Sequence, residues 1–229
     1  MRVAIFAEGR SDQAVLTNIL KGKLNIDKSE IRYELPAYEY DQTDLAVMPE
    51  EQFSNWTVVK QTCEEKTRIS KFLGDFDDGR FVIIQIDTAE RHLENYNVTV
   101  PNKTGVTRAE YCSLLRPNII AKINEWLDNS FTDKIAYAVG IEEIEAWVMT
   151  IYTNNNQDTS HNNDPKASLF RLLNRNFTGK QRKILTEVDT FKKFETLSSP
   201  FRKPKNLIAF SIKNGSLQLF LDSLENFAI

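Results

Sequence analysis

The segment that most constrains the fold is residues 81–86, FVIIQI, which stands directly before Asp87. Five of its six side chains are apolar, and most are β-branched or aromatic, the types that favour extended backbone. A strand that is buried on both faces of a parallel sheet has this nearly continuous apolar character. The segment is too short to favour a helix, so it predicts a central strand of a parallel sheet.

Other segments alternate between strand and helix patterns along the chain. Strands are predicted at 2–7, 31–38 and 134–139, with helices at 12–23 (capped by Ser11), 56–73, 107–127, 141–151, 165–174 and 215–226 and a strand or turn at 207–211. Polar residues 41–55 are expected to form a loop or insertion. This alternation predicts an α/β fold, with a mostly parallel central sheet flanked by helices and joined by right-handed crossovers.

A polar stretch, TNNNQDTSHNND at 153–164, divides the chain into two unequal parts. Its composition is typical of a loop or hinge. We expect residues 1–152 to form the α/β core and residues 165–229 to form a helical, basic C-terminal region packed on that core.

The bulk properties favour a cytoplasmic protein. No apolar run approaches the roughly 20 residues of a membrane span. The opening MRVAIFAEGR is too short for a signal peptide and fits a first strand better. Cys63 and Cys112 lie far apart and outside any metal-binding spacing, which favours two reduced, buried thiols.

The charge is distributed unevenly. Residues 166–205 contain eleven Lys or Arg and three Asp or Glu, a net charge of +8, so the remainder of this −3 chain carries −11. A basic field beside an acidic body suits a polyanionic partner such as nucleic acid, although a solvated helical face would have the same composition. The candidate nucleic-acid-binding residues are Lys166, Arg171, Lys180, Arg182 and Lys183.

Acidic residues follow three of the predicted strands. Glu8 ends the first, Asp87 ends the apolar strand, and Glu142, Glu143 and Glu145 come just after residues 134–139. Ligands of open α/β sheets bind beyond the carboxyl ends of the strands. Carboxylates that converge there repel one another unless a cation or proton intervenes, and oxygen ligands favour Mg²⁺ or Mn²⁺. Each could instead be an ordinary helix cap or turn residue.

Glu145 shares the predicted inward stripe of its helix with Ile141, Ile144 and Val148. A carboxylate on a packed face is costly unless it is paired or bound to metal. We therefore expect Glu145 either to bind the cation or to pair with an Arg or Lys, while Glu142 and Glu143 point more toward solvent.

Three motifs in this order resemble a known family. EGRSDQAVLTNIL at 8–20 resembles the first Toprim motif, and FVIIQID at 81–87 resembles the strand that carries the second. VGIEEIEAWVM at 139–149 resembles a segment of Toprim-like proteins of the RloB type, and DPKASLFRLL and NGSLQLFLDSL resemble their C-terminal part. The resemblance covers most of the chain and implies a Toprim-like core with a helical C-terminal extension.

One position departs from the family pattern. The second Toprim motif is Asp-x-Asp, but this chain has Asp87-Thr88-Ala89. Glu90 could replace the missing acid only if the turn is rearranged. The missing acid argues against a full two-metal site and favours one ion held by Glu8, Asp87 and Glu145. Glu90 is a further candidate ligand, and Gly9, Asp12 and Glu142 are candidate supporting residues.

The resemblance implies phosphodiester chemistry that depends on Mg²⁺ or Mn²⁺, with Glu8 and Asp87 as catalytic residues. No Tyr stands in a nucleophile motif, so hydrolysis of DNA or RNA is favoured over strand passage. The family's setting implies phage defence and an ATPase partner, while this chain has no P-loop of its own. The alternatives are a non-catalytic subunit with a degenerate site that binds nucleic acid or the ATPase, and a small-molecule phosphate enzyme.

Overall fold

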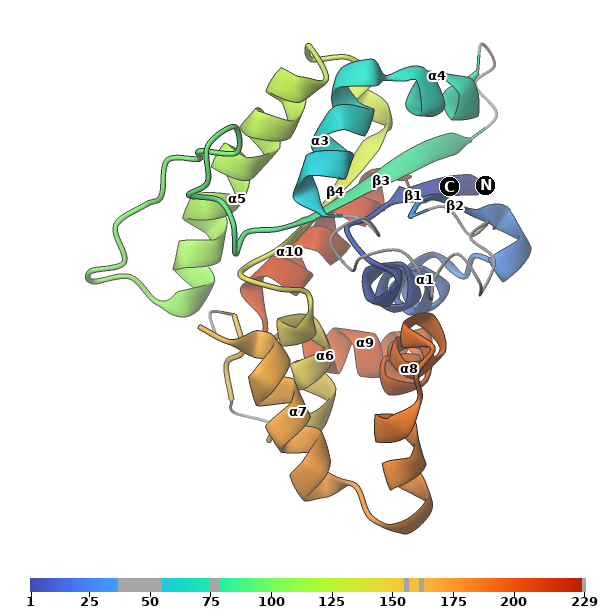
Figure 1. Ribbon diagram of the computed structural model, residues 1–229, viewed down its shortest axis with the longest axis vertical. Helices are drawn as coiled ribbons and strands as arrows, with labels where there is room; N and C mark the ends of the chain where they lie inside the picture. The colour runs from blue at the N-terminus through green and yellow to red at the C-terminus, as the bar shows by residue number, and fades with distance from the viewer. Residues whose placement is uncertain (37–54, 75–78, 155–156, 161–162, 228–229) are drawn as a thin grey trace.

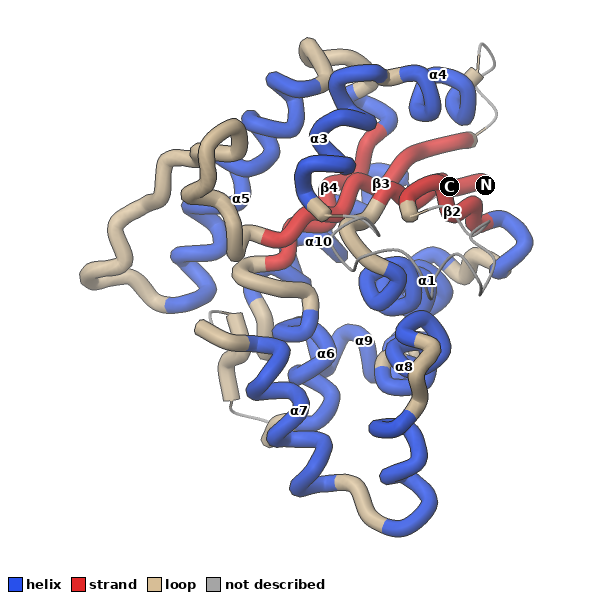
Figure 2. The backbone as a smooth tube through the Cα atoms, viewed as in Figure 1, coloured by secondary structure: helices blue, strands red, loops and turns tan. Residues whose placement is uncertain are grey.

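The computed structural model describes residues 1–36, 55–74, 79–154, 157–160 and 163–227. Its centre is a four-stranded sheet, the red strands of Figure 2, in the order β2-β1-β3-β4. The strands are β1 (Arg2–Phe6), β2 (Ile31–Leu35), β3 (Arg80–Asp87) and β4 (Ile135–Gly140), and every neighbouring pair is parallel. The predicted α/β class with a parallel sheet is confirmed.

The order of the strands creates a switch point between β1 and β3. From β1 the chain crosses to β2 on one side, and then returns to place β3 on the other side. We expected β1 and β3 to be neighbours, and their register, with Ile5 beside Ile83, confirms it. The crevice at such a switch point, beyond the carboxyl strand ends, is where open α/β sheets bind ligands.

Strands β1, β3 and β4 each contribute to two hydrophobic cores because alternate side chains point to opposite faces of the sheet. Val3 and Ile5 lie in one core, whereas Ala4 and Phe6 lie in the other. Figure 1 shows α3 and α5 above the sheet, and α1 and the C-terminal helices below it. The long apolar run of β3 follows directly from this coverage on both faces.

Most of the helices lie where the sequence predicts them. The α-helices are α1 (Arg10–Leu24), α3 (Trp56–Glu65), α4 (Thr67–Leu73), α5 (Arg108–Trp126), α6 (Glu145–Tyr152), α7 (Pro165–Asn176), α8 (Thr190–Leu197), α9 (Pro204–Ser211) and α10 (Gly215–Ser223). Short 3₁₀ helices occupy Lys28–Glu30 (η1), Thr132–Lys134 (η3), Gly179–Thr186 (η4), Ser199–Arg202 (η5) and Leu224–Phe227 (η6). No helix among the described residues is long and apolar enough to cross a membrane.

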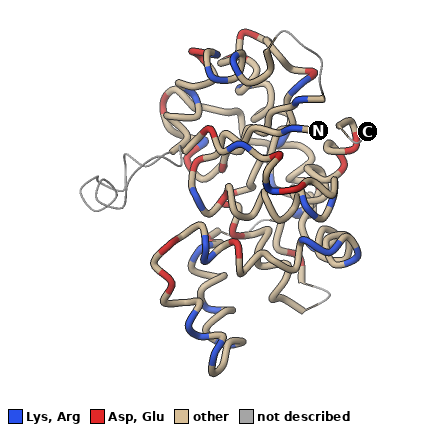
Figure 3. The backbone as a smooth tube through the Cα atoms, turned by 90° about the vertical axis from the view of Figure 1, so that its right-hand side faces the viewer, with Lys and Arg blue, Asp and Glu red and all other residues tan. Residues whose placement is uncertain are grey.

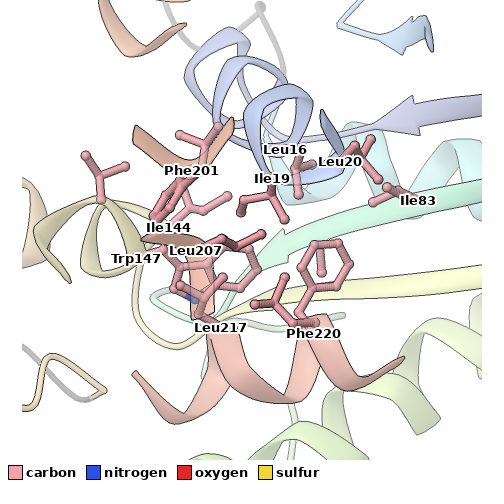
Figure 4. Packing of buried hydrophobic residues seen from close by; sticks show 14 of the residues in the cluster. Leu16, Ile19, Leu20, Ile83, Ile144, Trp147, Phe201, Leu207, Leu217 and Phe220 are labelled. Atoms are coloured by element: carbon pink, nitrogen blue, oxygen red, sulfur yellow. The ribbon is translucent and has the colours of Figure 1, made fainter. Parts of the chain in front are cut away.

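The C-terminal region shares a core with the sheet. Trp147 of α6 stacks on Phe220 of α10 with ring centroids 5.4 Å apart, and its Nε1 donates a hydrogen bond of 2.7 Å to Ser216 Oγ. Figure 4 shows this pair packed with Ile83 of β3 and with side chains of α1. Residues far apart in sequence thus form one buried cluster beneath the sheet.

Two predicted elements in the first half of the chain differ from the structure. The helix predicted at 56–73 is two helices, because Lys66 adopts a left-handed conformation (φ 58°) and breaks it between α3 and α4. Ser11 is not a cap, since α1 begins at Arg10 with Gly9 as its N-cap residue. β2 ends at Leu35, and residue 38 and nearly all of the predicted 41–55 loop lie outside the described residues.

Two further elements differ in the second half. The strand or turn predicted at 207–211 is helix α9, which begins at Pro204, a residue whose fixed φ favours the first helical turn. A short apolar run cannot distinguish a strand from one side of a helix. The helix predicted at 141–151 begins only at Glu145, because residues 141–144 form a loop that leads out of β4.

Replacing Phe220 with Ala should lower the free energy of unfolding by about 3–5 kcal/mol, the cost of a large cavity in a core. Urea denaturation followed by circular dichroism should still show one transition, at lower urea, because Phe220 packs with the sheet. As a control, Ile212→Ala changes a side chain that is 75% exposed and should stay within about 0.5 kcal/mol. A separate early transition that leaves the rest unaltered would contradict a shared core.

Candidate functional site

The ends of β1 and β3 are joined by a small hydrogen-bond network. The backbone N–H of Asp87 donates to Glu8 Oε1 over 2.6 Å, and the backbone N–H of Glu8 donates to Gln85 Oε1 over 2.9 Å. Gln85 Nε2 then donates to Asp87 Oδ1 over 2.9 Å, and Gln85 is fully buried. The network fixes both carboxyl groups at the switch point, with part of each residue still accessible to solvent.

Asp87 is also held closely from β4 and from the loop that follows β3. Gly140 lies opposite Asp87 in the β3–β4 register, and a Cβ on Gly140 would lie 2.3 Å from Asp87 Oδ1. The buried hydroxyl of Tyr96 donates to the Asp87 carbonyl oxygen over 3.0 Å. The observed position of the Asp87 carboxyl group therefore requires a glycine at residue 140, because a side chain there would collide with it.

The loops after β3 and β4 are clamped to each other. Arg91 donates two hydrogen bonds, of 2.8 and 2.9 Å, to the two carboxylate oxygens of Glu142. Thr88 Oγ1 accepts from the Glu142 backbone N–H over 2.8 Å, and Glu142 has a positive φ of 62°. The expectation that Glu142 points toward solvent is wrong. Its carboxylate is engaged by Arg91, so Glu142 supports the loop and is not available as a metal ligand.

Two further acids come from the first turns of helices. Asp12 of α1 and Glu145 of α6 are only 5% and 7% exposed. Burial, with the charge of nearby Glu143, raises the pKa of Asp12 to about 7. Burial, and then the charges of Asp12 and Glu143, raises the pKa of Glu145 to about 8. Among the described residues, no Arg or Lys lies within ion-pair distance of Glu145, so the alternative of a buried ion pair is not observed there.

These acids influence one another and form one group around Asp87. Burial raises the pKa of Asp87 well above its usual value, and the charges of its acidic neighbours raise it further. The neighbours that do so are Asp12, Glu8, Glu145 and Glu143. We call Glu8, Asp12, Asp87, Glu143 and Glu145 the carboxylate cluster.

Glu90 lies outside the carboxylate cluster, next to its member Glu8. Burial raises the pKa of Glu8 well above its usual value, against the opposing effect of the Asp87 N–H, and Asp12 and Glu90 raise it further. Glu90, in the turn after β3, therefore lies close enough to Glu8 for their charges to interact. Its role as a replacement for the missing acid stays a prediction.

The donor set of the carboxylate cluster is typical of a site for a hard cation. It consists of carboxylate oxygens, which Mg²⁺ and Mn²⁺ prefer. In the arrangement observed, however, no three His, Cys, Asp or Glu side chains of the described residues converge on a point where they could ligate one ion. The residues fit a cation chemically, and binding would require their side chains to turn toward it.

The predicted supporting and basic residues are divided between two places. Gly9 lies beside the cluster, where a Cβ would be 3.2 Å from Asp12 Oδ2. Lys166, at the start of α7, also lies beside the carboxylate cluster. It is close enough for its charge to lower the pKa of both Asp12 and Glu145. Arg171 is one turn further along α7 and is exposed.

The remaining basic candidates are Lys180, Arg182 and Lys183 of η4, which are exposed at the tip that Figures 1 and 3 show below α7. Arg182 Nε donates to the Phe177 carbonyl oxygen over 3.1 Å. None of the three contacts the carboxylate cluster within the described part of the chain.

Sequence reasoning did not identify Gln85, Gly140 or Tyr96 as site residues, and it counted Glu143 among the acids after residues 134–139 but expected it to point more toward solvent. A signal for Gln85 was present, since it is the only polar residue in an apolar strand and stands two residues before Asp87, on the same face. Gly140 ends β4 as Asp87 ends β3, and such a strand-end Gly indicates a close approach. Nothing in the local pattern distinguishes Glu143 from Glu142.

Comparison of the chain with protein-family models, with characterised proteins and with solved structures found no match.

The metal-free protein should lose stability as the pH rises from about 5 to about 8. Asp12 and Glu145 hold protons in the folded state up to pH values of about 7 and 8, whereas the unfolded chain releases them near 4. Between these limits the folded state binds more protons, so raising the pH favours unfolding, by at least about 2 kcal/mol in total. Thermal denaturation in EDTA at several pH values measures this.

Asp12→Asn should flatten that pH profile and should stabilise the protein at pH 8, because it removes a buried charge. Glu94→Gln, at an exposed position in the loop after β3, is the control and should leave the profile unchanged. A parent protein whose stability rises between pH 5 and 8 would contradict the clustering of these acids.

Gly140→Ala should destabilise the protein by about 1–3 kcal/mol, because the new methyl group collides with the Asp87 carboxyl group. In an Asp87→Ala background part of that cost should disappear, which a double-mutant cycle measures as a coupling energy. Gly179→Ala is the control. It strains the backbone because Gly179 has a φ of 51°, but its Cβ meets nothing within 4 Å, so its cost should be independent of Asp87. Additive effects of Gly140→Ala and Asp87→Ala would contradict the contact.

Proposed function

We propose that this protein is a divalent-cation-dependent phosphodiester hydrolase of Toprim-like type that acts on DNA or RNA. The observation that carries the proposal is the carboxylate cluster at the β1/β3 switch point. Buried acids that raise one another's pKa lack sufficient neutralising charge, and a bound cation would provide it.

The position of the cluster supports a ligand site rather than a set of structural caps. Glu8 and Asp87 stand at the carboxyl ends of adjacent parallel strands, where the strand order reverses. Asp12 and Glu145 arrive from the first turns of helices on the same side of the sheet. A protein rarely buries several acids together without a functional reason, because each loses its hydration.

Glu8, Asp87 and Glu145 would hold Mg²⁺ or Mn²⁺. The cation, when bound, neutralises charge on the phosphoryl oxygens and lowers the pKa of a water molecule. Gln85 and the Asp87 N–H orient the carboxyl groups of Asp87 and Glu8 through the hydrogen bonds described above. Glu8 would act as general base and then general acid, taking a proton from the attacking water and returning it to the leaving oxygen.

The missing second acid of the Asp-x-Asp motif is compensated in this proposal by acids from other elements. Thr88 occupies the middle position and binds the Glu142 backbone. Asp12 and Glu145 approach Asp87 from α1 and α6, and Glu90 approaches Glu8. The number of acids is thus retained, although their order along the chain differs.

A second candidate is a non-catalytic subunit that binds nucleic acid or an ATPase partner through a degenerate site. The absence of three converging ligands among the described residues favours it. In either case the resemblance to RloB-type proteins suggests phage defence. The unpaired, buried Cys63 and Cys112 suit the cytoplasm, where we place the protein.

Mg²⁺ or Mn²⁺ should raise the melting temperature, because a ligand that binds only the folded state stabilises it, by about 2.7 kcal/mol at 100 times its dissociation constant. Glu8→Gln and Asp87→Asn should each remove most of this shift, whereas the exposed control Glu94→Gln should retain it. The shift should be larger at pH 8 than at pH 6, since protons compete with the cation for the same acids.

Labelled single- and double-stranded oligonucleotides of DNA and RNA, incubated with and without Mn²⁺, test the reaction itself. Cleavage that needs the cation and falls at least about 100-fold in Glu8→Gln would support the hydrolase. A cation-dependent melting shift without any cleavage would favour the binding subunit. No shift with either cation would overturn the proposed site.

A further inference from the structure

One face of α7 forms an open hollow of about 470 Å³ beside the carboxylate cluster. Its lining combines one acidic, two cationic, two apolar and one amide side chain from the N-cap and one face of α7. These are Asp164, Lys166, Ala167, Phe170, Arg171 and Asn174. Figure 1 shows α7 alongside α6, whose first residue is Glu145 of the cluster.

Phe170 is the unusual residue in this hollow. Its side chain is 46% exposed although most large apolar residues of this chain are buried. Lys193 of α8 holds its Nζ 5.3 Å from the centroid of the Phe170 ring, and the same amine donates to the Leu185 carbonyl oxygen. An aromatic ring that stays accessible between cations provides a surface on which a nucleic-acid base can stack.

The hollow is connected to the carboxylate cluster through the first turn of α7. The backbone N–H of Lys166 donates to Glu143 Oε2 over 3.1 Å. Phe170 follows Lys166 by four residues, which is a rise of about 6 Å along the helix. A strand that stacks a base on Phe170 would therefore bring a neighbouring phosphate toward the cluster.

The surface of the hollow is mostly apolar, and the cations around it are complementary to a phosphate backbone. Lys166 and Arg171 line it, and Lys193 borders it. Its one acid, Asp164, is occupied as the cap of α7, where its side chain accepts from the Ala167 N–H. Without such cations, the acidic body of the protein would repel a polyanion from the carboxylate cluster.

We propose that this hollow binds single-stranded nucleic acid, with a base stacked on Phe170 and phosphates held by Lys166 and Arg171. The inference rests on the proposed function and specifies its substrate as a single strand. Bases within a duplex are already stacked on each other, so a duplex offers no free base face to Phe170.

The test is binding of a fluorescein-labelled oligothymidine of about 12 nucleotides, measured by anisotropy in EDTA. Phe170→Ala should weaken binding about tenfold, and Phe170→Trp should restore it and add tryptophan quenching upon binding. Leu114→Ala is the matched control, because Leu114 on α5 is 48% exposed and lies outside the hollow. Arg171→Ala should reduce the slope of log K against log salt by about 0.7.

Because the assay contains no divalent cation, its outcome is separate from that of the cation site. Binding that Phe170→Ala leaves unchanged would overturn the stacking role, and a duplex that binds as tightly as the single strand would overturn the assigned substrate. If binding depends on Phe170 but Mg²⁺ and Mn²⁺ do not change the melting temperature, the result would support single-strand binding in this hollow and overturn only the proposed hydrolase.

Discussion

The burial of several carboxyl groups beside one another is the constraint on which the rest of this structure depends. Each loses hydration, and each is placed where its neighbours are also acidic. The fold offsets this cost with hydrogen bonds from Gln85 and from the Asp87 backbone, and with protons that the acids retain to higher pH. In the proposed function, a bound cation would offset the rest of this cost.

The packing below the sheet explains how acids from helices are held beside acids from strands. Asn18, in the middle of α1, donates to the Glu195 carbonyl oxygen and to Ser198 Oγ, and accepts from Arg202 Nε. These bonds fix α1 against α8 and η5. Asp12, two turns earlier on the same helix, is thereby positioned by residues of the C-terminal region. That region is thus part of the framework of the site as well as a source of basic side chains.

The loop after β3 contains the position at which the sequence departs from the Toprim motif that it resembles. Where that motif has a second acid, this chain has Ala89, and the preceding Thr88 binds the loop that leads out of β4. Arg91 then engages Glu142 with both of its terminal nitrogens. This clamp removes one acid from the site but fixes the path of the chain toward Glu145.

The sequence by itself determined the parallel sheet, the pairing of β1 with β3 and the inward direction of Glu145. Each depends on a local pattern, because apolar runs and helical spacing specify which faces are buried. Only the tertiary structure decided the partners of the acids. Glu142 and Glu143 are adjacent and identical in type, yet one pairs with Arg91 and the other approaches Asp12. The position of a residue along a strand or helix sets the direction of its side chain. The partners of that side chain come from segments distant in the chain, as Gln85, Gly140 and Phe170 also show.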